Sequence, residues 1–236
     1  MNDAGDDLEI EYRFLSEVGD SWRYRLRLDP LTLAHRLVPR AAYPSWVDLT
    51  AHQCRNCPLA RDTTPRCPAA VSLVDLVEAA GALTSHEMVR VEVHTPERTV
   101  TTDTTLQRGL SSLLGLVLAT SGCPHAAYFR PMARFHLPLA DENETIYRAT
   151  SMYLLAQYFV AREGRPADLG LSGLTAIYND VQLVNRALAE RLRVACRQDA
   201  PVNAVILLDV IAKALPLTIG SQLAELRHLF GAYVGS

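Results

Sequence analysis

The hydrophobic period of the chain changes once, near Thr104, and this change constrains the fold more than any other feature. Before it, residues 8–29 and 87–103 alternate apolar and polar side chains, which is the pattern of half-buried strands in two hairpins. A three-residue loop in the first hairpin would place Phe14 opposite Leu26. After Thr104, apolar residues recur at helical spacing. The sequence therefore predicts an α+β fold, in which a small N-terminal antiparallel sheet of two hairpins packs on a C-terminal helical bundle.

These two patterns divide the chain into a β-hairpin region, residues 1–103, and a helical bundle, residues 104–236. The first region contains a cysteine-rich loop at 39–70, which is irregular and rich in proline. Four strands in two hairpins need a helix against their apolar face. We therefore predict that the two regions fold as one cooperative domain.

Local signals predict where two of the helices begin. Thr104 with Gln107, and Asp141 with Glu144, have the spacing of capping boxes. Arg148 lies four residues after Glu144, which is the favoured spacing for an ion pair on a helix surface.

Composition excludes several classes of protein. A net charge of -3 argues against a general nucleic-acid binder, which usually has a basic face. The acidic first residues do not have the pattern of a signal peptide. The apolar residues 110–122 are too few to span a bilayer. We expect a cytoplasmic protein that binds neither nucleic acid nor membrane, with an unidentified small molecule or protein as its partner and its oligomeric state open.

Three of the five cysteines lie within residues 51–70. In the cytosol thiols stay reduced, so clustered cysteines are metal ligands or redox groups more often than disulfides. Cys54 and Cys57 form a C-x2-C pair, a spacing that lets both thiolates bind one metal. Cys67 would be the third ligand, and Cys123 or His125 would complete a tetrahedral set. The sequence predicts a closed, structural zinc site that fastens the loop to the end of the first long helix.

Three alternatives to zinc remain open. Cys57, Cys67 and Cys123 each precede a proline, and Cys-Pro pairs also occur among the ligands of iron–sulfur clusters. The same cysteines would then form a redox or sensor centre. A thiol redox pair is the second alternative, and the pKa of Cys123 is lowered if Pro124 opens a new helix. The third is that the cysteines share no role.

A second group of candidate residues, Arg130, Arg134 and His136, lies within seven residues. They could bind a phosphate or a carboxylate. We favour the simpler interpretation, in which the arginines pair with nearby acids and His136 is hydrogen-bonded at a helix entry. In a metal-dependent enzyme with an open coordination position, His125 or His136 would be a ligand or general base. The chain contains no phosphate loop or nucleophile elbow, so the sequence leaves open whether it is an enzyme.

Two blocks of the sequence, "QCRNCPL…RCP" and "LQRGLSSLLGLVLATSGCPHAAYFRPMARFHLP", resemble a bacterial family without an established activity. The resemblance covers most of the chain. It implies that the cysteine loop and the "SGCPH" segment are parts of the same structural unit. It implies no activity, cofactor or residue role.

Overall fold

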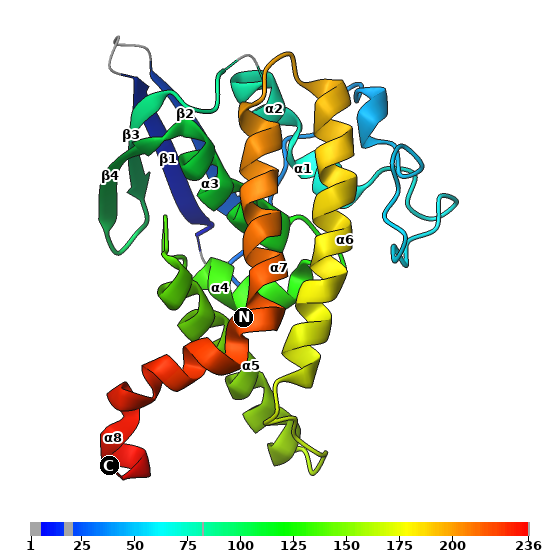
Figure 1. Cartoon of the computed structure of the whole chain (residues 1–236). Helices are drawn as coiled ribbons and strands as arrows, with labels where there is room; N and C mark the ends of the chain where they lie inside the picture. The colour runs from blue at the N-terminus through cyan, green and yellow to red at the C-terminus, as the bar shows by residue number, and fades with distance from the viewer. Residues whose placement is uncertain (1–5, 17–20, 82, 236) are drawn as a thin grey trace.

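The computed structural model describes residues 6–16, 21–81 and 83–235, except the side chains of residues 218 and 221. Within these residues both predicted hairpins are confirmed, and they form one antiparallel sheet in the order β2-β1-β3-β4 (Figure 1). The strands are β1 (Leu8–Ser16), β2 (Ser21–Leu28), β3 (Met88–His94) and β4 (Thr99–Thr105).

The register of the first hairpin differs from the prediction by four residues. Phe14 lies opposite Trp22, and Leu26 lies opposite Ile10. The rings of Phe14 and Trp22 stack with their centroids 4.1 Å apart, while on its other side Phe14 pairs with Val91 of β3. Most of the predicted loop lies outside the described residues. Because a shift by an even number keeps each side chain on its face of the sheet, the predicted apolar face is unchanged.

The part of the chain after the first hairpin is mainly helical, which confirms the α+β fold. The described α-helices are α1 (Pro68–Ser72), α2 (Val74–Ala80), α3 (Leu106–Thr120), α4 (Arg130–Arg134), α5 (Glu142–Arg162), α6 (Ser172–Ala195), α7 (Ala200–Leu226) and α8 (Gly231–Val234). The described 3-10 helices are η1 (Ser45–Val47), η2 (Ala127–Phe129) and η3 (Arg227–Phe230).

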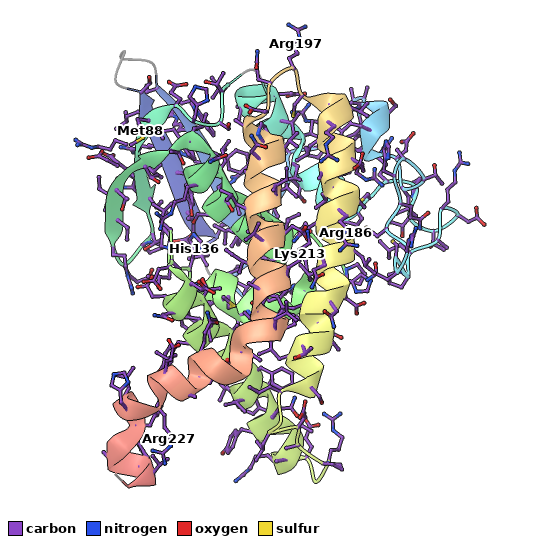
Figure 2. The ribbon with its side chains drawn as sticks, viewed as in Figure 1. Met88, His136, Arg186, Arg197, Lys213 and Arg227 are labelled. Atoms are coloured by element: carbon purple, nitrogen blue, oxygen red, sulfur yellow. The ribbon has the colours of Figure 1, made fainter. Side chains whose placement is uncertain are left out.

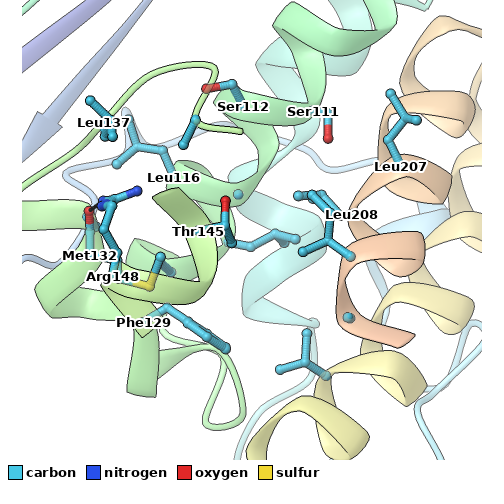
Figure 3. Close-up of a pocket in the computed structure, with 18 of the residues that line it drawn as sticks. Ser111, Ser112, Leu116, Phe129, Met132, Leu137, Thr145, Arg148, Leu207 and Leu208 are labelled. Carbon is cyan, nitrogen blue, oxygen red and sulfur yellow. Dashed lines mark hydrogen bonds between the residues drawn. The ribbon is translucent and has the colours of Figure 1, made fainter. Parts of the chain in front are cut away.

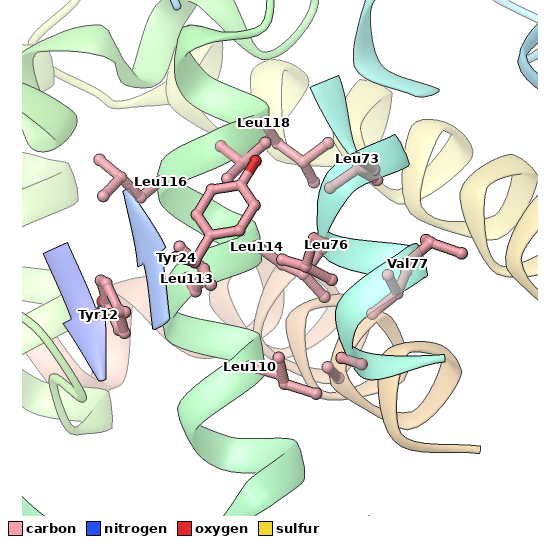
Figure 4. Close-up of a cluster of buried hydrophobic side chains, with 14 of the residues drawn as sticks. Tyr12, Tyr24, Leu73, Leu76, Val77, Leu110, Leu113, Leu114, Leu116 and Leu118 are labelled. Atoms are coloured by element: carbon pink, nitrogen blue, oxygen red, sulfur yellow. The ribbon is translucent and has the colours of Figure 1, made fainter. Parts of the chain in front are cut away.

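The helix α3 is the centre of the core. Its leucines pack between tyrosines of the sheet on one side and residues of α2 on the other (Figure 4). Gly109 brings this helix close to the sheet, since a Cβ there would lie 2.8 Å from a ring carbon of Phe14 and from a methyl of Val91. One cluster of buried side chains contains residues of both predicted regions, from Ile10 to Val205.

The predicted capping box at the start of α3 is wrong. The helix begins after Thr105, and Thr105 makes no side-chain cap bond. The backbone N–H of Gln107 instead donates to the carbonyl oxygen of Ser85 at 3.0 Å. A neighbouring loop therefore satisfies the free N–H groups of the first turn, and Thr104 is not needed for this role.

The two long helices α5 and α7 begin and end differently. The predicted capping box of α5 is confirmed, with Asp141 and Glu144 exchanging hydrogen bonds of 2.8 Å. The helix α7 packs against α3 and α6 and then turns away from α6 (Figure 1). Pro216 lies inside α7, where a proline removes one backbone hydrogen bond and bends a helix. Among the described residues, the segment 200–217 of α7 is long and apolar enough to cross a membrane by length and composition.

Candidate metal centre

The cysteine-rich loop lies beside α6, on the side remote from the sheet (Figure 1). The backbone N–H of Cys57 donates to the carbonyl of Cys54 at 3.1 Å, which closes a tight turn between the two thiols. Cys67 is the N-cap of α1, and a proline follows it as the first helical residue. Its own N–H donates to the carbonyl of Val47 at 2.8 Å. Backbone hydrogen bonds therefore fix the positions from which three of the predicted ligands project.

All five predicted ligands line one small cavity of about 20 Å³. Its other walls come from prolines of the loop and from α6. A cavity needs roughly 10–15 Å³ to hold one water molecule. The space between the thiols therefore admits a single species about the size of a water or an ion. The lining cysteines and histidine are Cys54, Cys57, Cys67, Cys123 and His125.

Burial and neighbouring thiols raise the pKa of two of the cysteines that line this cavity. Burial raises the pKa of Cys54 to about 12, and the neighbouring Cys67, Cys123 and Cys57 add to the rise. Burial also raises the pKa of Cys123, although backbone N–H groups at Ala126 and His125 hydrogen-bond its sulfur and oppose the rise. The lowered pKa expected for a reactive Cys123 is therefore not the net result.

The side chains are gathered but not in coordination geometry. Among the described residues, no group of three or more His, Cys, Asp or Glu side chains is placed so that it could hold a metal ion as it stands. The cysteines are free of disulfides. Metal binding at this cavity would require rotation of cysteine side chains and loss of their protons, which is the usual course for thiolate ligands.

His125 is hydrogen-bonded through one ring nitrogen and faces a carboxylate with the other. Its Nε2 lies 2.8 Å from the carbonyl oxygen of Asn56, the residue inside the C-x2-C turn. Because a carbonyl only accepts, Nε2 is the protonated nitrogen in this bond. Its Nδ1 lies 3.6 Å from a carboxylate oxygen of Asp180 on α6. The amide of Asn56 in turn donates to the side chain and backbone oxygens of Asp180, at 3.0 and 3.2 Å. This network holds the turn against α6.

Arg191 is a residue of this site that sequence reasoning missed. It lies on α6, lines the cysteine cavity and is only 1% exposed. Its guanidinium donates to the backbone carbonyls of Trp46 at 2.5 Å, Asp48 at 2.8 Å and Leu49 at 2.9 Å. Its charge opposes the rise in the pKa of Cys54 that burial and the neighbouring cysteines cause. The sequence contained a signal for its burial, because Arg191 lies between leucines that face inward on an amphipathic helix.

Two residues of the second predicted group, Arg134 and His136, line one cavity together with Arg148. Arg134 is exposed and lies 3.8 Å from Glu97. The Nε of Arg130 is buried and has no hydrogen-bond partner among the described residues. His136 lies between the sheet and α4 (Figure 2), with its Nε2 2.6 Å from the hydroxyl of Tyr12. The hydrogen bond of His136 and the contact of Arg134 with Glu97 agree with the simpler interpretation.

Arg148 takes a different role from the predicted surface ion pair. Its Nη2 donates to the backbone carbonyls of Met132 and Phe135, both at 2.9 Å. Glu144 caps α5 instead and is not within ion-pair distance. Arg148 is thus a half-buried cation close to His136. Burial lowers the pKa of the His136 imidazole, and the charge of Arg148 adds to this effect.

Comparison with known proteins identifies one family. A family model described as a domain of unknown function, DUF6901, matches residues 10–231. No curated protein and no solved structure gives a significant match to the chain.

Proposed function

The chain belongs to the DUF6901 family, whose function is unknown, and we propose that it is a metal-binding protein with one zinc ion held by Cys54, Cys57, Cys67 and Cys123. The observation that carries this proposal is that four cysteines from three separate segments line a cavity of about 20 Å³. Free cysteines otherwise prefer isolated apolar positions. Four thiols around one ion-sized space are the donor set of a structural zinc site.

Cys123 is the fourth ligand in this proposal, and His125 supports the site from outside. The hydrogen bond of His125 to Asn56 already uses its Nε2, and its Nδ1 lies 3.6 Å from a carboxylate oxygen of Asp180. These contacts orient the C-x2-C turn, as hydrogen bonds to the groups around a metal site usually do. A set of four thiolates leaves no open coordination position, so the zinc would be structural rather than catalytic.

The charge of the site also supports the proposal. Zinc with four thiolates has a net charge of about −2, which is costly to bury unless groups nearby stabilise it. The buried guanidinium of Arg191 lines the same cavity, and two backbone N–H groups point at the sulfur of Cys123. These groups would offset the negative charge.

The role of the zinc would be to fasten the loop at residues 39–70 to the end of α3 and to α6. Such long segments with little regular structure need an organiser inside a folded domain. Metal binding contributes directly to folding free energy, because the site does not exist in the unfolded chain. Removal of the metal is therefore expected to loosen this loop first.

The test is the metal content and visible spectrum of protein purified without oxygen or chelator. We expect one equivalent of zinc in the wild type, and its loss together with thermal stability in a Cys54→Ser/Cys57→Ser variant. Cys196→Ser is the matched control, because Cys196 is a half-buried free cysteine outside the cavity. Iron with sulfide and a visible chromophore would instead show that these cysteines bind an iron–sulfur cluster. No metal in any of the three proteins would overturn the proposal.

A second pair of variants identifies the fourth ligand. Cys123→Ser is expected to lose the zinc, whereas His125→Gln keeps it at weaker affinity. The opposite result would make His125 the ligand and would reopen the possibility of a site with a free position.

A further inference from the structure

A cavity of about 480 Å³ lies among α3, α4, α5, α6 and α7. Pockets for small molecules usually measure about 300–1,000 Å³ and are mainly apolar with a few polar groups. This cavity has that character. Arg148 and Met132 lie on one side of it, and Leu207 and Leu208 lie on the opposite side (Figure 3).

The polar group that best indicates a ligand is Arg148. Among the described residues no carboxylate lies within 4 Å of its guanidinium, and the hydrogen bonds it makes use Nη2 alone. Burial lowers its pKa, which reflects the cost of holding this charge away from water. Arginine binds carboxylates through paired N–H groups. Nε and Nη1 are therefore free to bind an anion.

Asn185 is a second, independent indication. It is 2% exposed on α6 and lines the cavity, and its Oδ1 has no hydrogen-bond partner among the described residues. A buried amide oxygen without a partner is costly, so native proteins usually supply a donor. A ligand group that donates a hydrogen bond would satisfy it.

Of the described residues that line the cavity, Arg148 is the charged group that lies inside it. His136 is neutral, because burial lowers its pKa to about 3 and its Nε2 is bound to Tyr12. The hydroxyl of Tyr12 also lies 2.8 Å from that of Ser112. The remaining charged residues of the lining, Arg108, Asp141 and Glu142, are exposed at its rim.

We propose that this cavity binds a small, mainly apolar carboxylic acid, with its carboxylate on Arg148 and a hydrogen-bond donor group near Asn185. The apolar part would contact the leucines of α3 and α7. This inference does not rest on the proposed zinc site, because the linings of the two cavities share only Val184.

Calorimetric titration of the full chain with decanoate and with decanol tests the carboxylate without any variant. We expect decanoate to bind about tenfold more tightly or better, since the alcohol cannot form charge-assisted bonds with the guanidinium. Equal binding of acid and alcohol, or no binding of either, would overturn the proposal.

Variants then locate the contact. Arg148→Met is expected to weaken decanoate about tenfold and to leave decanol unchanged, whereas Leu208→Trp should fill the cavity and weaken both. Arg162→Met is the matched control, because Arg162 is an exposed arginine of the same helix outside the cavity. Wild-type affinity of Arg148→Met for decanoate would refute the assignment of Arg148.

The donor group is tested with ω-hydroxydecanoate. Its affinity is expected to exceed that of decanoate in the wild type, and this difference should vanish in Asn185→Leu. A difference that persists in Asn185→Leu, or the absence of any difference in the wild type, would overturn the role given to Asn185.

Discussion

Replacement of Arg191 by methionine would show how strongly α6 holds the first part of the cysteine-rich loop. Arg191 is almost fully buried, and its guanidinium makes three hydrogen bonds to the backbone carbonyls of Trp46, Asp48 and Leu49. Methionine keeps the apolar part of the side chain and removes all of the donors. The substitution therefore isolates the hydrogen bonds from the packing.

The expected loss follows from the burial of each bond. The bond to Leu49 is buried, so its carbonyl would lose its partner without reaching water, at a cost of about 1–3 kcal/mol. The bonds to Trp46 and Asp48 are partly buried, and water can replace the donor there at about 0.5–1 kcal/mol each. Methionine also avoids the cost of desolvating the buried guanidinium, and this gain offsets part of the loss. We expect Arg191→Met to lower the free energy of unfolding by about 2–4 kcal/mol.

Urea denaturation of Arg191→Met beside Arg193→Met measures this effect. Arg193 is exposed and pairs with Glu190 on the same helix, so its replacement should change stability by less than about 0.5 kcal/mol. A fall of the metal content of Arg191→Met would further connect this residue to the cysteine site. If both variants unfold at the same urea concentration as the wild type, the three hydrogen bonds do not hold the segment and the reasoning fails.

Three further predictions concern the core, the pH dependence and a helix cap. Gly109→Ala is expected to destabilise the protein by about 1 kcal/mol, since crowding against Phe14 outweighs the gain in helix propensity. Gly115→Ala should stabilise it by about 0.5–1 kcal/mol, because a Cβ there meets Leu208 at an ordinary 3.5 Å; thermal melts of the two variants should shift in opposite directions. The pKa of His136 is near 3 in the folded protein, below its unfolded value, so the unfolded chain binds a proton first. Stability should therefore fall as the pH drops from about 6.5 towards 3, and His136→Asn should flatten this part of a pH series of denaturation curves. Asp141→Ala should cost about 1 kcal/mol in urea denaturation through loss of the capping box, and an unchanged midpoint would contradict that role.

Some features of the fold are local and could be predicted from residues close in sequence. Alternation with a period of two gave both hairpins, because every second side chain of a strand faces the core. The capping box of Asp141 and Glu144 needs only one turn of helix, and it is present. The register of the first hairpin is different, because the pairing of Phe14 with Trp22 also depends on how β1 pairs with β3.

The candidate site also has a part that local sequence predicts and a part that depends on distant residues. The spacing of Cys54 and Cys57 predicted a turn with two thiols, and the structure contains that turn. Which residues complete the site could be given only as alternatives, since Cys123 and His125 come from a distant part of the chain. The tertiary structure separates these two candidates for the fourth ligand, because it places His125 in contact with Asn56 and Asp180.

The sequence by itself determined the two hairpins, the helical character of the chain after them and the apolar faces of both, because hydrophobic period acts over a few residues. Only the tertiary structure decided the roles of the charged residues. Arg148 has the spacing of a surface arginine yet lines the large cavity, and the three backbone carbonyls that Arg191 contacts come from a distant loop. A charged side chain carries no local mark of the carbonyl groups that it will meet, since these come from segments far away in the chain. Its energy in the folded protein depends on those partners and on the water they exclude.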